Sequence, residues 1–328
     1  MHMRPRLAHR AALSLAIALS LAIALTMSGA PARGDASGSG ADSGAAAGAQ
    51  PPARIVSLDY CADQFVLKFA PRAAIAGLSP DADADFSYMR AAAVGLPVVR
   101  PRAEDVLIAR PDLVVRSYGG GAGIAAHLAR AGAPTLPIGF ARSVAEVRAN
   151  VLRIAAALGA PAAGEAAVRR MTARIAAAAP PAGQAPLSAL YLTTGGWTTG
   201  PGTLVDELMT AAGLRNIETR AGWRPLPLER LARETPDLIA TAFFDTDSQR
   251  PGSWSSARHP VTRAMLAHAP TVALKGAWTS CGGWFLADAV EALAAARDRV
   301  IAARDRVIAG RDGAVPGRDG AVAGRAVR

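Results

Sequence analysis

The sequence predicts an α/β fold in two halves, each built around a parallel sheet with helices on both of its faces. Short apolar strands alternate with amphipathic helices along most of the chain, which is typical of such sheets. A long helical stretch over residues 143–178 interrupts the alternation near the middle. A sequence motif around Pro111 recurs around Pro236, and this repetition indicates an internal duplication of the α/β half.

The first half begins with a β-branched strand and an amphipathic helix. Residues 62–69 place Phe65, Val66 and Phe69 on one helical face. Short apolar runs that no polar residue interrupts predict strands that are buried on both faces of the sheet. The expected elements of this half are a strand at 54–58, a helix at 62–69, strands at 75–78 and 113–115, a helix at 124–131 and a strand at 135–138.

The central helical stretch begins at Ser143, and Glu146 three residues later completes a capping-box spacing. Gly159, Pro161 and Gly164 stand in its middle. Proline and glycine both weaken a helix interior, so one kinked rod and two successive helices are equally compatible with this stretch.

The second half resumes the alternation after two prolines at 180–181. Its expected elements are a strand at 187–192, a helix at 203–212, a strand at 238–241, a helix at 261–268, a strand at 271–274 and a last helix from residue 285. In both halves a glutamate, Glu104 or Glu229, precedes a Pro-Asp-Leu phrase by seven residues, and the copies are 125 positions apart. This pattern predicts a short helix that a proline ends before a buried strand.

The first 34 residues have the features of a secretory signal peptide. Arg4, Arg6 and Arg10 form a basic head, the apolar run 11–27 follows, and small residues with a proline come next. A retained membrane anchor is the alternative, although the run is shorter than the roughly 20 apolar residues that span a bilayer. We expect cleavage and a periplasmic location.

Low-complexity segments border the folded part. Residues 35–52 are rich in Gly, Ser, Ala and Pro, which predicts a flexible linker. Residues 301–328 repeat a seven-residue Arg/Asp phrase; its start could extend a terminal helix, and we expect disorder after Gly310. The predicted organisation is therefore a signal peptide at 1–34, a linker at 35–52, an N-terminal lobe at 53–142, a bridging segment at 143–179, a C-terminal lobe at 180–300 and a tail at 301–328.

The net charge of +10 does not indicate a nucleic-acid partner. Residues 1–34 contribute four arginines and no acid, and residues 297–328 contribute eight arginines against four aspartates. The folded middle therefore carries only +2 of the total, which is too little for an electrostatic nucleic-acid surface.

Aromatic residues make up only 5% of the chain, and several follow directly after predicted strands. Open α/β sheets bind ligands at the carboxyl ends of their strands, and flat rigid rings suit a large planar or greasy metal chelate. The candidate ligand-binding residues are Tyr60, Tyr88, Tyr118, Trp197, Trp223, Phe243, Trp254, Trp278 and Trp284. Phe65, Phe69, Phe140 and Phe285 are assigned to the core instead.

The two cysteines, Cys61 and Cys281, are both expected in turns that face the ligand. In an exported chain they could form a disulfide; free thiols and a metal-ligating pair are the alternatives. The mature part has only His127, His259 and His268, which stand far apart in the sequence. No protein metal site is therefore expected, although the tyrosines could act as axial ligands to a haem iron.

No catalytic residues are expected, and the chain is interpreted as not an enzyme. A secreted hydrolase would need a positioned nucleophile and base, and the Gly-x-Ser-x-Gly elbow is absent from the sequence. A secreted hydrolase and a ligand sensor of a signalling receptor remain the alternatives from other functional classes.

On these motifs the chain resembles the class III periplasmic binding proteins, which serve ABC importers of vitamin B12, iron-siderophores and haem. The resemblance covers residues 53–296 and rests mainly on the order of the motifs. Besides the long helical stretch, the matching segments are RIVSLDYCADQFVLKFA at 54–70, EDVLIARPDLVV at 104–115, GPGTLVDELMTAAGLRNI at 200–217, the second Pro-Asp-Leu phrase, and WTSCGGWFLADAVEALAAA at 278–296.

The resemblance implies two Rossmann-like lobes joined by a long bridging α-helix, with the ligand cleft between them. It implies a monomeric extracytoplasmic receptor that captures a metal complex, either an iron-siderophore or cobalamin, and delivers it to the membrane permease. A haem receptor is the alternative, and no intrinsic cofactor is implied.

The resemblance also implies roles for individual residues. Glu104 and Glu229 match the exposed glutamates, one on each lobe, that dock into arginine pockets of the permease. Trp223 matches a tryptophan that lines the cleft of vitamin B12 binding proteins. The corresponding tryptophan of the first lobe is replaced by Val98, which is a departure from the B12 pattern.

Overall fold

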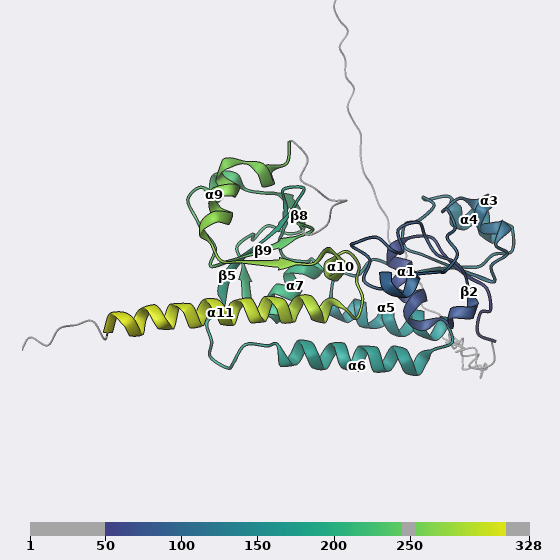
Figure 1. Cartoon of the computed structure of the whole chain (residues 1–328), viewed down its shortest axis with the longest axis horizontal. Coiled ribbons are helices and arrows are strands. Elements are labelled where there is room, and N and C mark those ends of the chain that lie inside the picture. The colour runs from purple at the N-terminus through teal and green to yellow at the C-terminus, as the bar shows by residue number, and fades with distance from the viewer. Residues whose placement is uncertain (1–49, 245–253, 313–328) are drawn as a thin grey trace, which may run out of the picture. The chain divides into compact units, whose positions relative to one another are not determined.

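The computed structural model describes residues 50–244 and 254–312, and side chains up to residue 309 (Figure 1). The expected signal peptide, the linker up to residue 49 and the tail from residue 313 lie outside the described residues. No helix within the described ranges is long and apolar enough to cross a membrane.

The first lobe is built on a four-stranded, fully parallel sheet with the strand order β2-β1-β3-β4. Ile55 of β1 lies opposite Leu113 of β3, and Ile55, Val56 and Val114 are completely buried. The strands are β1 (Ile55–Ser57), β2 (Ile75–Gly77), β3 (Leu113–Arg116) and β4 (Thr135–Pro137). The helices are α1 (Tyr60–Phe69), η1 (Arg72–Ala74), α2 (Arg90–Ala93), α3 (Ala103–Ile108) and α4 (Ile124–Arg130).

The second lobe contains another fully parallel sheet, with the strand order β10-β9-β5-β7. Its strands are β5 (Leu187–Thr193), β7 (Leu214–Asn216), β9 (Leu238–Ala242) and β10 (Thr271–Leu274). A separate antiparallel pair joins β6 (Trp197–Thr199) to β8 (Trp223–Pro225). The helices are α7 (Leu204–Ala211), α8 (Leu228–Leu231), η3 (Ser256–Arg258), α9 (Pro260–His268), α10 (Gly276–Thr279) and α11 (Leu286–Asp312).

The structure confirms the predicted strands and helices of both halves and resolves the alternative in the middle. The central stretch consists of two helices, α5 (Val144–Ala157) and α6 (Pro161–Ala177). Gly159 adopts a left-handed φ of 78° after α5, and Pro161 opens α6. The two helices pack closely, because a Cβ atom on Gly164 would lie 2.5 Å from the Cβ atom of Ala155. The central stretch is therefore not one continuous rod. Helix α5 contacts α1 and α7, while α6 lies beside α11 (Figure 1).

Polar contacts fix both of these helices. The Ser143 hydroxyl accepts a hydrogen bond from the backbone N–H of Glu146, and the Glu146 carboxylate accepts one from the N–H of Arg142. Arg174 of α6 binds Asp288 and Glu291 of α11 at 2.5 Å each. The predicted helix start is thus confirmed, and α6 is tied to the last helix of the second lobe.

The predicted duplication has a structural counterpart at the start of each sheet. Asp112 accepts hydrogen bonds from the backbone N–H groups of Ala53 and Arg54, at 2.7 and 3.0 Å, just before β1. Asp237 accepts bonds from the N–H and the hydroxyl of Ser188 in β5, at 2.7 Å each. In both lobes, the aspartate of the Pro-Asp-Leu phrase therefore holds the start of the neighbouring strand.

One buried carboxyl group makes stability depend on pH. Asp63 of α1 is fully buried and accepts bonds from the N–H and hydroxyl of Ser79, at 3.1 and 2.6 Å. Burial raises the pKa of Asp63 to about 7, and the bonds from Ser79 only partly oppose this. The folded protein therefore holds a proton that the unfolded chain releases near pH 4.

We expect protonated Asp63 to stabilise the folded protein fully below about pH 4. As the pH rises from about 4 towards 7, the free energy of unfolding should fall by about 1.4 kcal/mol per pH unit. Thermal melts between pH 4 and 8 should show this slope in the wild-type chain and a flatter one in Asp63→Asn. Asp305→Asn, at an exposed aspartate, is the control. Equal slopes for wild type and Asp63→Asn would contradict the assignment.

Candidate functional site

The described residues enclose a pocket of about 640 Å³ between loops of the two lobes. This volume lies within the range of small-molecule and cofactor sites. The first lobe lines it with Tyr60, Cys61, Phe65, Ser117, Tyr118 and residues 138–142. The second lobe lines it with residues 201–205, Leu208, residues 221–223, residues 279–282 and Leu286. As predicted for an open α/β sheet, the first-lobe residues follow the carboxyl ends of β1, β3 and β4.

Two tyrosines stand together in the first-lobe wall. Tyr60 is the first residue of α1, and Tyr118 follows β3. Their ring centroids are 6.0 Å apart in an edge-on arrangement, and their hydroxyl groups are hydrogen-bonded to each other. Tyr60 also packs edge-on against Phe86, at 4.8 Å. The sequence singled out both tyrosines, and the structure brings them into one site.

Burial raises the pKa of both phenols above the ordinary value. For Tyr60 the bond from Tyr118 partly offsets the effect of burial. The pKa of Tyr118 is raised further by the nearby Tyr60 and by the charge of Asp59. Both hydroxyls are therefore protonated at neutral pH unless a cation binds to them and displaces the proton.

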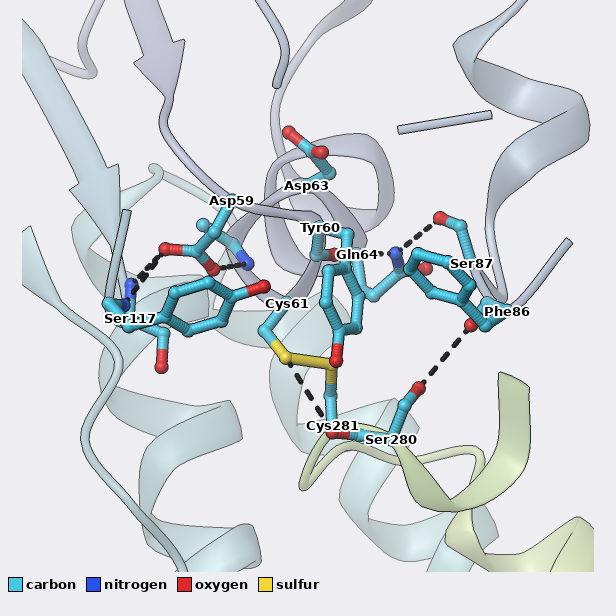
Figure 2. The surroundings of a disulfide bond; sticks show 12 residues. Asp59, Tyr60, Cys61, Asp63, Gln64, Phe86, Ser87, Ser117, Ser280 and Cys281 are labelled. Atoms are coloured by element: carbon cyan, nitrogen blue, oxygen red, sulfur yellow. Dashed lines mark hydrogen bonds between the residues drawn. A yellow bond between two sulfur atoms is a disulfide. The ribbon is translucent and has the colours of Figure 1, made fainter. Parts of the chain in front are cut away.

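A disulfide forms part of the pocket wall. Cys61 in the first turn of α1 is bonded to Cys281 in the turn after α10 (Figure 2). Both cysteines are more than nine-tenths buried. The Ser280 hydroxyl, next to this bridge, donates a hydrogen bond to the backbone oxygen of Phe86 at 3.3 Å. Of the alternatives that the sequence left open, the structure contains the disulfide, and it links the two lobes.

An aromatic cluster beside the disulfide packs the lobes against each other. Trp284 of the second lobe lies 5.7 Å from Phe65 and 5.4 Å from Phe69, and Tyr88 stacks on Phe285 at 4.6 Å. Tyr88 and Trp284, which the sequence suggested as ligand-binding residues, are not among the residues that line the pocket. Their rings instead fill the interface between α1 and the start of α11.

Four further predicted ligand residues also lie away from the pocket lining. Trp197 is on β6, Trp254 is fully exposed, and Phe243 packs on the core after β9. Trp278 packs on the core, with the Lys275 ammonium 5.2 Å from its ring centroid. Each follows a strand or a glycine-rich turn as expected, but that position alone does not direct the ring into the pocket.

Trp223 and Phe140 complete the aromatic lining. Trp223 of β8 is one of the suggested ligand-binding residues; it lines the pocket and meets Tyr191 edge-on at 5.9 Å. Phe140 was assigned to the core from the sequence, but it is 81% exposed and lines the pocket. Gly139 before it adopts a left-handed φ of 82°, which turns the chain out of the sheet after β4. The position of Phe140 directly after a predicted strand was the signal that could have identified it.

Charged groups are sparse in this pocket. Among the described lining residues, Arg142 is the only one with a charged side chain, and it is exposed. Thr203, Ser280 and Ser117 add hydroxyl groups to walls that are otherwise mainly apolar. Within residues 50–244 and 254–312, no group of three or more His, Cys, Asp or Glu side chains could hold a metal ion.

The two glutamates predicted to face a partner lie outside the pocket. Glu104 is in the first turn of α3, and Glu229 is in the first turn of α8. Both are exposed, and one belongs to each lobe. A carboxylate at a helix start interacts favourably with the helix dipole while its oxygens stay accessible.

Residues 57–249 match the family model described as "Periplasmic binding protein". No curated protein matches the chain significantly in sequence. The fold is also similar to several solved structures of binding proteins. One is a periplasmic haem-binding protein from Pseudomonas aeruginosa, with 24% identity, a TM-score of 0.56, and coverage of 75% of this chain and 92% of that one.

Two more structures show the range of ligands among these proteins. The periplasmic haem-binding protein BhuT, solved with two haems, is 25% identical; the match covers 76% of this chain and 99% of that one, with a TM-score of 0.59. The periplasmic vitamin B12 binding protein BtuF of Vibrio cholerae is 18% identical, and the match covers 76% and 98% with a TM-score of 0.55.

Proposed function

The chain belongs to the periplasmic binding protein family, and from this premise we propose that its transported ligand is haem. It is a solute-binding protein of an ABC importer and not an enzyme. The haem assignment goes beyond this and is supported above all by the tyrosine pair, Tyr60 and Tyr118, in the pocket wall.

Ferric haem needs an axial oxygen or nitrogen donor and apolar walls around its ring. A tyrosine phenolate is an established type of donor to haem iron. Tyr60 and Tyr118 offer two such oxygens, while Phe140 and Trp223 add flat apolar surfaces from opposite lobes. Arg142 is available for a haem carboxylate, because a guanidinium can bind both oxygens of such a group. The similarity to BhuT, which binds haem, agrees with this assignment.

Cobalamin is the second candidate ligand. Trp223 lines the pocket at the position that the sequence resemblance gives to a cleft tryptophan of vitamin B12 binding proteins. The two candidates differ in the group that would hold the metal: in this pocket haem iron would take a tyrosine phenolate, whereas cobalamin would contact the aromatic walls without replacing a tyrosine proton.

Absorption titrations of the mature protein with ferric haem and with cobalamin test the proposal. We expect haem to bind with a tyrosine-ligated spectrum, and Tyr118→Phe and Tyr60→Phe each to weaken binding by about 10-fold or more, since a charge-assisted or coordinate contact is lost. Tyr88→Phe, outside the pocket, is the matched control and should bind normally.

The pH dependence provides an independent readout. The raised pKa values of Tyr60 and Tyr118 mean that a proton must leave the phenol when iron binds. Haem affinity should therefore rise with pH, by up to about tenfold per unit, below the pKa of the free phenol. A pH-independent haem complex, or tight cobalamin binding without haem binding, would contradict the proposal.

We further propose that Glu104 and Glu229 contact the membrane permease. Their exposure, their place in equivalent helices of the two lobes and the family of the chain support this role. The proposal assigns one acidic contact to each lobe.

A further inference from the structure

One buried carboxylate lies between the backbone segments that carry the two pocket tyrosines. Asp59 is 3% exposed and precedes Tyr60 at the start of α1. Its Oδ1 accepts the N–H of Ala62 at 2.9 Å, which caps the helix. Its Oδ2 accepts three consecutive backbone N–H groups after β3, those of Ser117, Tyr118 and Gly119, at 2.7, 3.0 and 2.9 Å.

The loop after β3 is held tightly in this position. A Cβ atom on Gly119 would lie 2.1 Å from the backbone oxygen of Leu58, so only glycine allows the two segments to approach so closely. Arg116 holds the same loop through its guanidinium, which donates to the oxygens of Gly119 and Gly121 at 3.0 and 2.9 Å. Figure 2 shows the Asp59 carboxylate directed at the backbone of Ser117.

This arrangement does more than cap a helix. A helix cap needs one oxygen, and Oδ1 already provides it. The second oxygen receives three N–H groups from a loop 58 to 60 positions away, and the middle one belongs to Tyr118. The Asp59 carboxylate thus fixes the backbone of Tyr118 relative to the backbone of Tyr60, the residue that follows Asp59 in the chain.

We infer that Asp59 is the positioning residue of the tyrosine pair: it holds Tyr60 and Tyr118 at the spacing that lets both hydroxyls face one ligand atom. The inference about the ligand rests on the proposed haem function, whereas the inference about the loop does not. It assigns Asp59 no contact with the ligand.

Asp59→Asn tests the inference, because an amide has one acceptor oxygen where the carboxylate has two. The Nδ2 group would have to face either the N–H of Ala62 or the three N–H groups of the loop. Asp112→Asn is the matched control: Asp112 also accepts two backbone N–H groups in the first lobe, but it does not line the pocket.

The first measurement is hydrogen exchange of the peptide covering residues 113–121 in the ligand-free proteins. We expect exchange at 117–119 to be about 10-fold faster or more in Asp59→Asn and unchanged in Asp112→Asn. Gly119→Ala, which keeps the carboxylate but forces the loop away from Leu58, should also speed exchange. Wild-type exchange rates at 117–119 in both Asp59→Asn and Gly119→Ala would overturn the inference even if haem never binds.

The second measurement is ferric haem affinity as a function of pH. The charge of Asp59 raises the pKa of both phenols, so a purely electrostatic role predicts that Asp59→Asn binds haem more tightly at low pH. A positioning role predicts affinity about 10-fold lower throughout, with a mixed spectrum. Tighter haem binding by Asp59→Asn than by the wild type would overturn the positioning role. If the wild type does not bind haem at all, the haem proposal is wrong, and the hydrogen-exchange result alone decides the role of Asp59.

Discussion

Replacing Cys61 and Cys281 together by serine is expected to lower the free energy of unfolding by about 5 kcal/mol. The disulfide joins residues 220 positions apart, so it closes a very long loop in the unfolded chain. Loss of a long loop closure increases the entropy of the unfolded state, in the chain-entropy account of disulfides. Urea denaturation of the double variant and the wild type, followed by circular dichroism, measures the difference.

Treatment of the wild type with a dithiol reductant is the second arm of this experiment. It should reproduce the destabilisation of the double variant, and it should have no effect on the double variant itself. Because the pocket wall includes both cysteines, ligand affinity should fall as well. A loss of less than about 1 kcal/mol would show that the bridge contributes little to holding the lobes together.

Changing Glu104 and Glu229 together to alanine is expected to reduce ligand uptake by about 100-fold or more while ligand binding stays normal. Truncating a charged group that is paired at an interface typically costs 2–5 kcal/mol or more, and two such contacts are removed. Neither glutamate lines the pocket, so binding should be unaffected. Uptake of labelled haem by cells that carry the importer, together with titration of the purified variant, separates the two effects.

A double variant at other exposed helix acids provides the control. Glu165 and Asp305 are exposed, and their change to alanine removes the same charge without touching α3 or α8. Each single variant, Glu104→Ala or Glu229→Ala, should show an intermediate defect if both lobes contact the permease. Normal uptake by Glu104→Ala/Glu229→Ala would refute the docking role.

The periodic parts of the fold could be predicted because local pattern and tertiary structure agree there. The consecutive apolar residues of β1 and β5 require burial on both sides, and the capping box at Ser143 fixes a helix start within a few residues. The antiparallel pair of β6 and β8 was not predicted, because Thr198 and Arg224 become partners only after the intervening segment, which contains α7 and β7, has folded. Short strands of that kind carry too little pattern of their own.

The candidate site was predicted less completely, for a related reason. Sequence position indicates that an aromatic residue follows a strand, but it does not decide whether the ring faces the pocket or a neighbouring ring. Trp284 illustrates this, because Phe65 and Phe69 lie close enough to enclose it. Phe140 illustrates the reverse: a residue typical of cores is exposed because Gly139 redirects the chain.

The attachment of the two lobes affects how cargo could be exchanged. The Cys61–Cys281 bridge and the rings around Trp284 fasten the buried end, while Tyr118, Phe140 and Trp223 lie at the open rim. Ligand entry and release would then require only that the two lobes separate at this open rim. The bridge itself limits how far the lobes can separate beside the pocket, because it joins α1 of the first lobe covalently to the turn after α10 of the second.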